Sequence, residues 1–97
     1  MSRTLIERRL RSVSERIKVL QRDLRVVEEQ LGHVVADAED ARLQALVSET
    51  PIAERHHHEA QRHADAMRRH RDDLLAELRE LESSQDSLLD RLVAART

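Results

Sequence analysis

The sequence contains no cysteine, phenylalanine, tyrosine or tryptophan, and only one glycine and one proline. Without cysteine the chain forms no disulfide and performs no thiol chemistry. Cysteine usage therefore does not indicate whether the protein works in an oxidising or a reducing compartment. Without aromatic residues it lacks the side chains on which proteins stack nucleic-acid bases. Charged residues make up 37% of the chain, and this composition is typical of long helices in a coiled coil rather than of a globular core.

Long hydrophobic runs are also missing. No stretch approaches the roughly 18 to 20 apolar residues that a membrane span needs, and the charged first residues lack the apolar core of a signal peptide. The formal net charge of −2 provides no general attraction to nucleic acid or to an anionic membrane. We therefore expect a cytoplasmic protein that binds neither nucleic acid nor membrane.

One short segment, SETP, divides the chain into two arms. Thr50 is a favourable N-cap residue, and Pro51 suits the first position of a helix. Because Pro51 disfavours helical geometry at the residue before it, a preceding helix should end just before Thr50. The segment predicts a turn at residues 48–51, between one helix of about residues 3–48 and another of about residues 51–95. Short connections join antiparallel neighbours.

Apolar residues in each arm recur at spacings that alternate between four and three. This heptad pattern predicts a coiled coil. We call these positions the seam. Folding the chain at Glu49 pairs every seam position of one arm with a seam position of the other, so residues 1–97 are expected to form a single all-α antiparallel coiled-coil hairpin. The seam of the first arm comprises Ile6, Leu10, Val13, Ile17, Leu20, Leu24, Val27, Leu31, Val34, Ala38, Ala41 and Ala45. The seam of the second arm comprises Ala53, His57, Ala60, Ala64, Met67, Arg71, Leu74, Leu78, Leu81, Gln85, Leu88 and Leu92.

Charge alternates along the chain in a way that fits the same hairpin. Residues 1–25 and 55–71 carry a net positive charge, whereas residues 26–54 and 72–97 carry a net negative charge. Folded at the turn, blocks of opposite sign lie side by side, and exposed pairs worth about 0.2–1 kcal/mol each favour this orientation and register. Arg9 beside Arg91 runs against the trend. The predicted cross-helix pairs are Arg16 with Glu77, Glu28 with Arg68, and Arg42 with Glu54.

Three seam positions are polar, namely His57, Arg71 and Gln85. A polar residue in a coiled-coil seam commonly selects register and partner number at some cost in stability. We expect these residues to select register. Near the turn the seam consists mostly of alanine, which lets the two helix backbones approach closely.

Several apolar residues lie outside the seam, where a two-helix hairpin cannot bury them. They are either scattered surface residues or contacts for a second copy or an unknown protein partner, because small scaffolds often gain stability by oligomerising. The second interpretation predicts a homo-oligomer, with a dimer favoured, in which two hairpins form a four-helix bundle. The candidate partner-binding residues are Leu43, Leu46, Val47 and Ile52, which we call the apolar tip, and Leu75, Leu89 and Val93, which we call the outer stripe.

The histidines allow two further hypotheses. His33, Asp37, Glu59 and His63 come near one another in the folded hairpin and offer nitrogen and oxygen ligands for Zn²⁺. The alternative is a simple Asp37 to His63 salt bridge. Protonation of His57 in the seam as the pH falls would loosen the turn end, as in histidine pH sensors.

The turn region, ARLQALVSETPIAE at residues 41–54, is similar to that of small coiled-coil hairpin proteins of actinobacteria. This resemblance implies the fold and a bacterial source, and it implies no activity. The predicted architecture also resembles the arm of seryl-tRNA synthetases and the coiled-coil domain of Gre-type transcript cleavage factors. Gre-type factors carry acidic residues at the tip to hold a metal, whereas Glu49 with Asp40 and Glu54 nearby does not match that motif.

No nucleophile with an adjacent base, Gly-rich phosphate loop or paired-acid pocket is present. We therefore expect no enzymatic activity and no cofactor. The favoured function is protein–protein interaction or scaffolding by a self-associating hairpin. The alternatives are a regulator that inserts its tip into a larger machine such as RNA polymerase, and a metal- or pH-responsive module.

Overall fold

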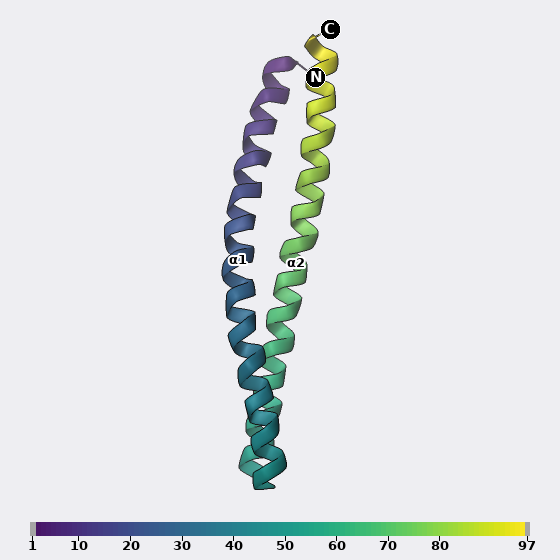
Figure 1. The fold of residues 1–97 in the computed structure, drawn as a ribbon. Coiled ribbons are helices and arrows are strands. Elements are labelled where there is room, and N and C mark those ends of the chain that lie inside the picture. The colour runs from purple at the N-terminus through teal and green to yellow at the C-terminus, as the bar shows by residue number, and fades with distance from the viewer. Residues whose placement is uncertain (1, 97) are drawn as a thin grey trace. The chain divides into compact units, whose positions relative to one another are not determined.

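The computed structural model describes residues 2–96, which form two long α-helices and no strand. Helix α1 spans Arg3–Ser48 and helix α2 spans Pro51–Arg96 (Figure 1). The predicted all-α hairpin with its turn after residue 48 is therefore confirmed. Within the described part of the chain, neither helix has a stretch apolar and long enough to cross a membrane.

Hydroxyl side chains cap the start of both helices. Thr50 Oγ1 accepts a hydrogen bond of 3.1 Å from the backbone N–H of Ala53, and α2 begins at Pro51. This is the cap that the sequence predicts, and such caps contribute about 1 kcal/mol. Ser2 Oγ does the same for the N–H of Leu5 at 3.2 Å. The sequence analysis does not predict the Ser2 cap.

Helix α1 ends with an unusual backbone conformation at Glu49. The φ angle of Glu49 is 52°, in the left-handed region, while its N–H still donates to the carbonyl oxygen of Ala45 at 3.1 Å. This geometry reverses the chain direction within two residues. It favours glycine, because a Cβ atom crowds the following carbonyl group in the left-handed region.

Replacing Glu49 by glycine is expected to raise the free energy of unfolding by up to about 1 kcal/mol, since relief of the left-handed strain exceeds the added backbone entropy of glycine. The matched control is Glu28→Gly, a substitution at an exposed position inside α1. This control should lower the free energy of unfolding by about 1 kcal/mol. Urea unfolding followed by helical circular dichroism measures both. Equal losses for the two variants would contradict the prediction.

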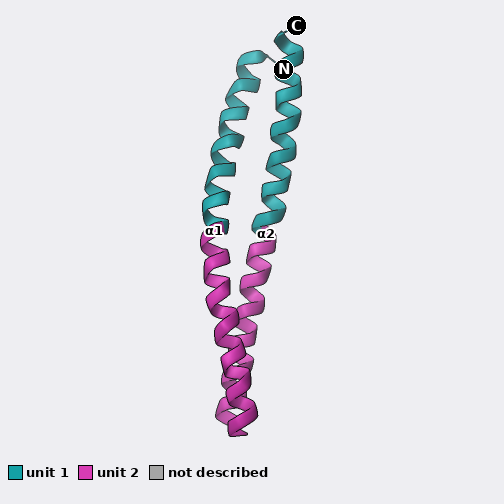
Figure 2. Ribbon diagram, in the orientation of Figure 1, with its two compact units in different colours: residues 1–24, 74–97 teal, residues 25–73 magenta. Residues whose placement is uncertain are grey.

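The structure divides into two compact units, and each contains a segment of both helices (Figure 2). Unit 1 comprises the described residues of 1–24 and 74–97, and unit 2 comprises residues 25–73. Both helices are continuous through the boundaries between these ranges.

Unit 1 contains a core of branched aliphatic side chains. Ile6 near the start of α1 packs in one cluster with Leu88 and Leu92 near the end of α2, and Leu10 and Val13 lie against this cluster. Because the first turns of α1 meet the last turns of α2, the two segments run antiparallel. This packing agrees with the pairing that the seam predicts.

Unit 2 contains the turn and a core of smaller side chains. Ala64 is 0% exposed, and the alanines at 38, 41 and 45 are almost as well buried. Val27 and Leu31 provide the larger buried side chains of this unit. Small side chains therefore form much of the contact between α1 and α2 near the turn, as the sequence predicts.

Burial follows the seam throughout residues 2–96. Every residue that the structure buries lies at a predicted seam position, and all other seam positions are half-buried. Most of the buried positions belong to α1. The α2 seam positions are mainly half-buried, and this holds for apolar residues such as Met67 and Leu74 as well as for the polar Arg71 and Gln85.

The predicted cross-helix ion pairs are only partly present. Arg16 Nη2 lies 3.0 Å from Glu77 Oε1, which confirms the pair in unit 1. The other two predictions are wrong, because intrahelical partners three residues away are already within reach. The observed alternatives are Arg42 with Glu39 at 2.6 Å and Arg68 with Asp65 at 3.2 Å.

Candidate functional site

The apolar tip is the most exposed apolar surface of unit 2. Leu43, Leu46 and Val47 are 47%, 63% and 84% exposed, and Ile52 is 76% exposed. The first three are spaced three and four residues apart, so they share one face of the last turns of α1. Ile52 lies in the first turn of α2. The hairpin therefore leaves these apolar side chains in water.

A bidentate ion pair flanks the tip on α1. Arg42 Nη2 donates to Glu39 Oε1 at 2.6 Å, and Arg42 Nε donates to Oε2 at 3.1 Å. The hydrogen bond from Arg42 lowers the pKa of Glu39, and the hydrogen bond to Glu39 raises the pKa of Arg42. Because the folded protein lowers the pKa of Glu39, the pair stabilises the fold fully when the pH is above the ordinary carboxyl pKa. This stabilisation is lost as the pH falls through the lowered pKa. Both side chains are exposed, so this contribution is small.

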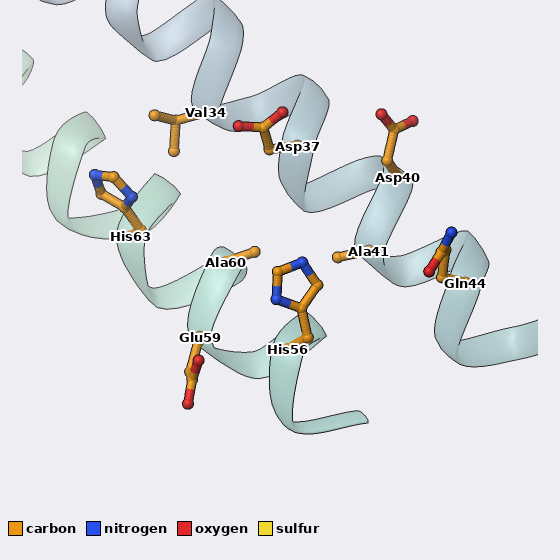
Figure 3. A pocket seen from close by; sticks show the side chains of 9 residues that line it. All are labelled: Val34, Asp37, Asp40, Ala41, Gln44, His56, Glu59, Ala60 and His63. Atoms are coloured by element: carbon orange, nitrogen blue, oxygen red, sulfur yellow. The ribbon is translucent and has the colours of Figure 1, made fainter. Parts of the chain in front are cut away.

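A pocket of about 480 Å³ opens beside the tip, between the α1 and α2 segments of unit 2 (Figure 3). The methyl groups of Ala41 and Ala60 point toward one another between the helices, and these small residues leave room for the pocket. Carboxylates and imidazoles surround it. We call it the histidine pocket, and its lining residues are Val34, Asp37, Asp40, Ala41, Gln44, His56, Glu59, Ala60 and His63.

The histidine pocket contains part of the predicted metal set. Asp37, Glu59 and His63 line it, whereas His33 is not among the lining residues. Figure 3 shows the Glu59 carboxylate pointing away from α1. Among residues 2–96 no three histidine, aspartate or glutamate side chains are placed to hold a metal ion together. The side-chain positions therefore do not assemble the predicted four-residue site.

The pocket also includes residues outside the predicted metal set. Asp40 and Gln44 come from α1, and His56 comes from α2 with its ring directed toward α1 (Figure 3). The signal that points to His56 is its spacing of one heptad from His63, which places both on the same side of α2. The alternative salt bridge between Asp37 and His63 is not among the ion pairs of the described residues.

Each polar seam residue is half-buried and has a nearby partner. Gln85 Nε2 donates to Ser14 Oγ across unit 1 at 3.0 Å. Arg71 Nη2 pairs with the neighbouring Asp72 at 3.0 Å. His57 stacks on His58, with ring centroids 5.5 Å apart. Of the three, only Gln85 bonds to the opposite helix, so the expected role in selecting register has its clearest structural basis there.

The outer stripe is less uniform than the tip. Leu89 and Val93 are 45% and 62% exposed, and their spacing of four places them on one face of α2. Leu75 is half-buried. Its side chain is therefore less available to a partner than the sequence predicts, and the exposed stripe in unit 1 reduces to Leu89 and Val93.

Together the fold and these surfaces define a two-helix hairpin with an exposed apolar tip and an adjoining acidic and histidine-lined pocket. No protein-family model matches the chain, and neither a curated protein nor a solved structure matches it significantly.

Proposed function

We propose that this protein is a non-enzymatic interaction module that self-associates as a dimer through its apolar tip, so that two hairpins form a four-helix assembly. The observation that carries the proposal is the exposure of the tip. Val47 and Ile52, at 84% and 76% exposed, are the most exposed large apolar side chains of the described residues. Burying large aliphatic side chains of this kind stabilises an assembly by about 1.5–3 kcal/mol each when burial is complete.

A second copy is the partner that this surface fits best. A two-fold dimer places the same patch of each copy in contact, so the patch must complement itself. An apolar stripe fulfils this condition, and the charges beside it have both signs, as in the Glu39 and Arg42 pair. The net charge of −2 adds little repulsion between copies.

The size of the tip limits how strong a tip-only dimer can be. A standard interface buries about 800 Å² on each partner and involves about 20–30 residues a side. Four apolar side chains are only the centre of such an interface. Polar neighbours on α1 and α2 must form its rim, and we expect an association that weakens visibly on dilution.

Sedimentation equilibrium over a range of concentrations tests the proposal. The wild-type protein should show a mass approaching twice the 11.3 kDa of the chain, with dissociation at low concentration. The double variant Leu46→Asp/Ile52→Asp should remain helical and sediment as a monomer, because two carboxylates would be buried without partners in the interface. The matched control is Leu5→Asp/Val26→Asp, which makes the same kind of change at exposed apolar positions away from the tip and should stay dimeric.

Two results would overturn the proposal. A wild-type protein that is monomeric at every concentration would rule out self-association and favour insertion of the tip into a larger protein machine. A Leu46→Asp/Ile52→Asp variant that stays dimeric would show that the tip is not the contact. Leu89→Asp/Val93→Asp then tests whether the outer stripe is the contact.

A further inference from the structure

A second pocket of about 470 Å³ lies in unit 1. Its residues are distant from the turn in the sequence. Side chains of both helices line it, and the apolar Val13 and Leu88 of the seam contribute to its wall. No acidic residue is among the lining residues. They are Arg9, Ser12, Val13, Ser83, Ser84, Ser87, Leu88 and Arg91.

The two arginines of this pocket have no carboxylate partner among residues 2–96. The arginines at 3, 16, 42, 68 and 71 each form an ion pair with an acidic side chain. Arg9 and Arg91 take part in none of the ion pairs of residues 2–96, although they line the same pocket from opposite helices. Like charges at one site repel each other, and an anion bound between them removes that repulsion.

Serine hydroxyls supply the rest of the polar surface. Ser12 comes from α1, while Ser83, Ser84 and Ser87 come from α2. None of these four hydroxyls is hydrogen-bonded to a side chain of the described residues, in contrast to Ser14, which accepts the bond from Gln85. A hydroxyl donates one hydrogen bond and rotates to suit its acceptor. The pocket therefore combines two guanidinium groups with several free donors.

We propose that this pocket binds the phosphate group of a small phosphorylated molecule. Guanidinium groups bind phosphate oxygens through paired, charge-assisted hydrogen bonds, and phosphate offers more acceptor oxygens for the serine hydroxyls than a carboxylate does. The volume of about 470 Å³ falls within the usual range of roughly 300–1,000 Å³ for small-molecule sites. It leaves space for an organic group beyond the phosphate.

The test uses the full chain and heteronuclear NMR titrations at constant ionic strength near neutral pH. Inorganic phosphate, glycerol 3-phosphate and acetate are added separately. Phosphate and glycerol 3-phosphate should produce saturable shifts at the amides of Ser83, Ser84 and Ser87, whereas acetate should bind several-fold more weakly. Stronger binding of glycerol 3-phosphate than of inorganic phosphate identifies a phosphorylated organic molecule as the ligand class.

Variants separate a specific site from general charge attraction. Arg9→Gln and Arg91→Gln should each weaken phosphate binding by about tenfold or more, since each removes charge-assisted hydrogen bonds. The matched control Arg8→Gln removes the same charge from an exposed position outside the pocket and should leave binding unchanged. Arg91→Glu should abolish binding while the protein stays folded, because the new carboxylate pairs with Arg9.

Three outcomes would overturn this proposal. They are the absence of saturable shifts with either phosphate compound, equal binding of acetate, and equal weakening by Arg8→Gln. None of these outcomes depends on self-association. Sedimentation of the Arg9→Gln and Arg91→Gln variants should match that of the wild-type protein, so failure of the phosphate site and failure of the tip dimer can be distinguished.

Discussion

Replacing Leu20 by alanine is expected to lower the free energy of unfolding by about 2–5 kcal/mol. Leu20 is 1% exposed and lies at a seam position of α1 in unit 1. Truncation removes buried methyl groups and leaves a cavity that the surrounding side chains fill only in part. Domains of this size are stable by only about 5–15 kcal/mol in total, so the loss should be a large share of the stability.

Urea and thermal unfolding of Leu20→Ala measure this effect. The chain has no tryptophan or tyrosine, so the helical circular dichroism signal rather than fluorescence must follow unfolding. Measurements at several protein concentrations separate intrinsic stability from association. The matched control is Leu5→Ala in the same unit, where the leucine is 41% exposed; its loss should stay under about 1 kcal/mol. Similar losses in both variants would contradict the burial pattern.

Enlarging Ala64 to leucine is expected to lower the free energy of unfolding by about 1–3 kcal/mol. Ala64 is 0% exposed in unit 2, where the alanines of α1 are also buried. Because the Ala64 side chain has no exposed surface, three additional carbon atoms cannot project into water and must fit among packed neighbours. They must displace a helix or adopt a strained rotamer, although leucine itself is a good helix former.

The matched control for Ala64→Leu is Ala66→Leu, two residues further along α2 at an exposed position. Because alanine and leucine have similar helix propensities, the control should change stability by less than about 0.5 kcal/mol. Thermal unfolding by circular dichroism compares the two variants directly. Equal or greater stability of Ala64→Leu would show that the helices of unit 2 can move apart without cost, and that their close packing is not required.

These two core variants also sharpen the functional tests. Leu20 and Ala64 are buried, so substitutions there should reduce association only as far as they unfold the hairpin. Substitutions at Leu46 and Ile52 should reduce association while the hairpin stays folded, because their side chains lie in water in the single chain. A tip variant that loses dimerisation together with helicity would not distinguish these effects, and the Leu5→Asp/Val26→Asp control then reports the cost of surface carboxylates alone.

The helices and their buried faces follow directly from the pattern of amino acids. Thr50 and Pro51 place the end of one helix and the start of the next, because proline restricts its predecessor and threonine caps the backbone N–H groups. The alternating spacing of apolar residues determines which face each helix buries, because burying those faces is the main favourable term in folding. The exposure of Leu46 and Val47 follows from the same pattern, since both lie outside the seam.

The polar side chains that meet depend on how the two helices pack, and the amino-acid pattern does not specify them. Arg42 has carboxylates within reach on its own helix and across the turn, and these options differ by less than about 1 kcal/mol. Its pairing with Glu39 at 2.6 Å, the gathering of His56 with Asp37 and the shared pocket of Arg9 and Arg91 depend on local helix separation and rotamers. Heptad spacing specifies which face of each helix is buried, and it places a residue to within about one helical turn. A binding site requires atoms placed to within fractions of an ångström. Packing of the two helices against each other provides that precision.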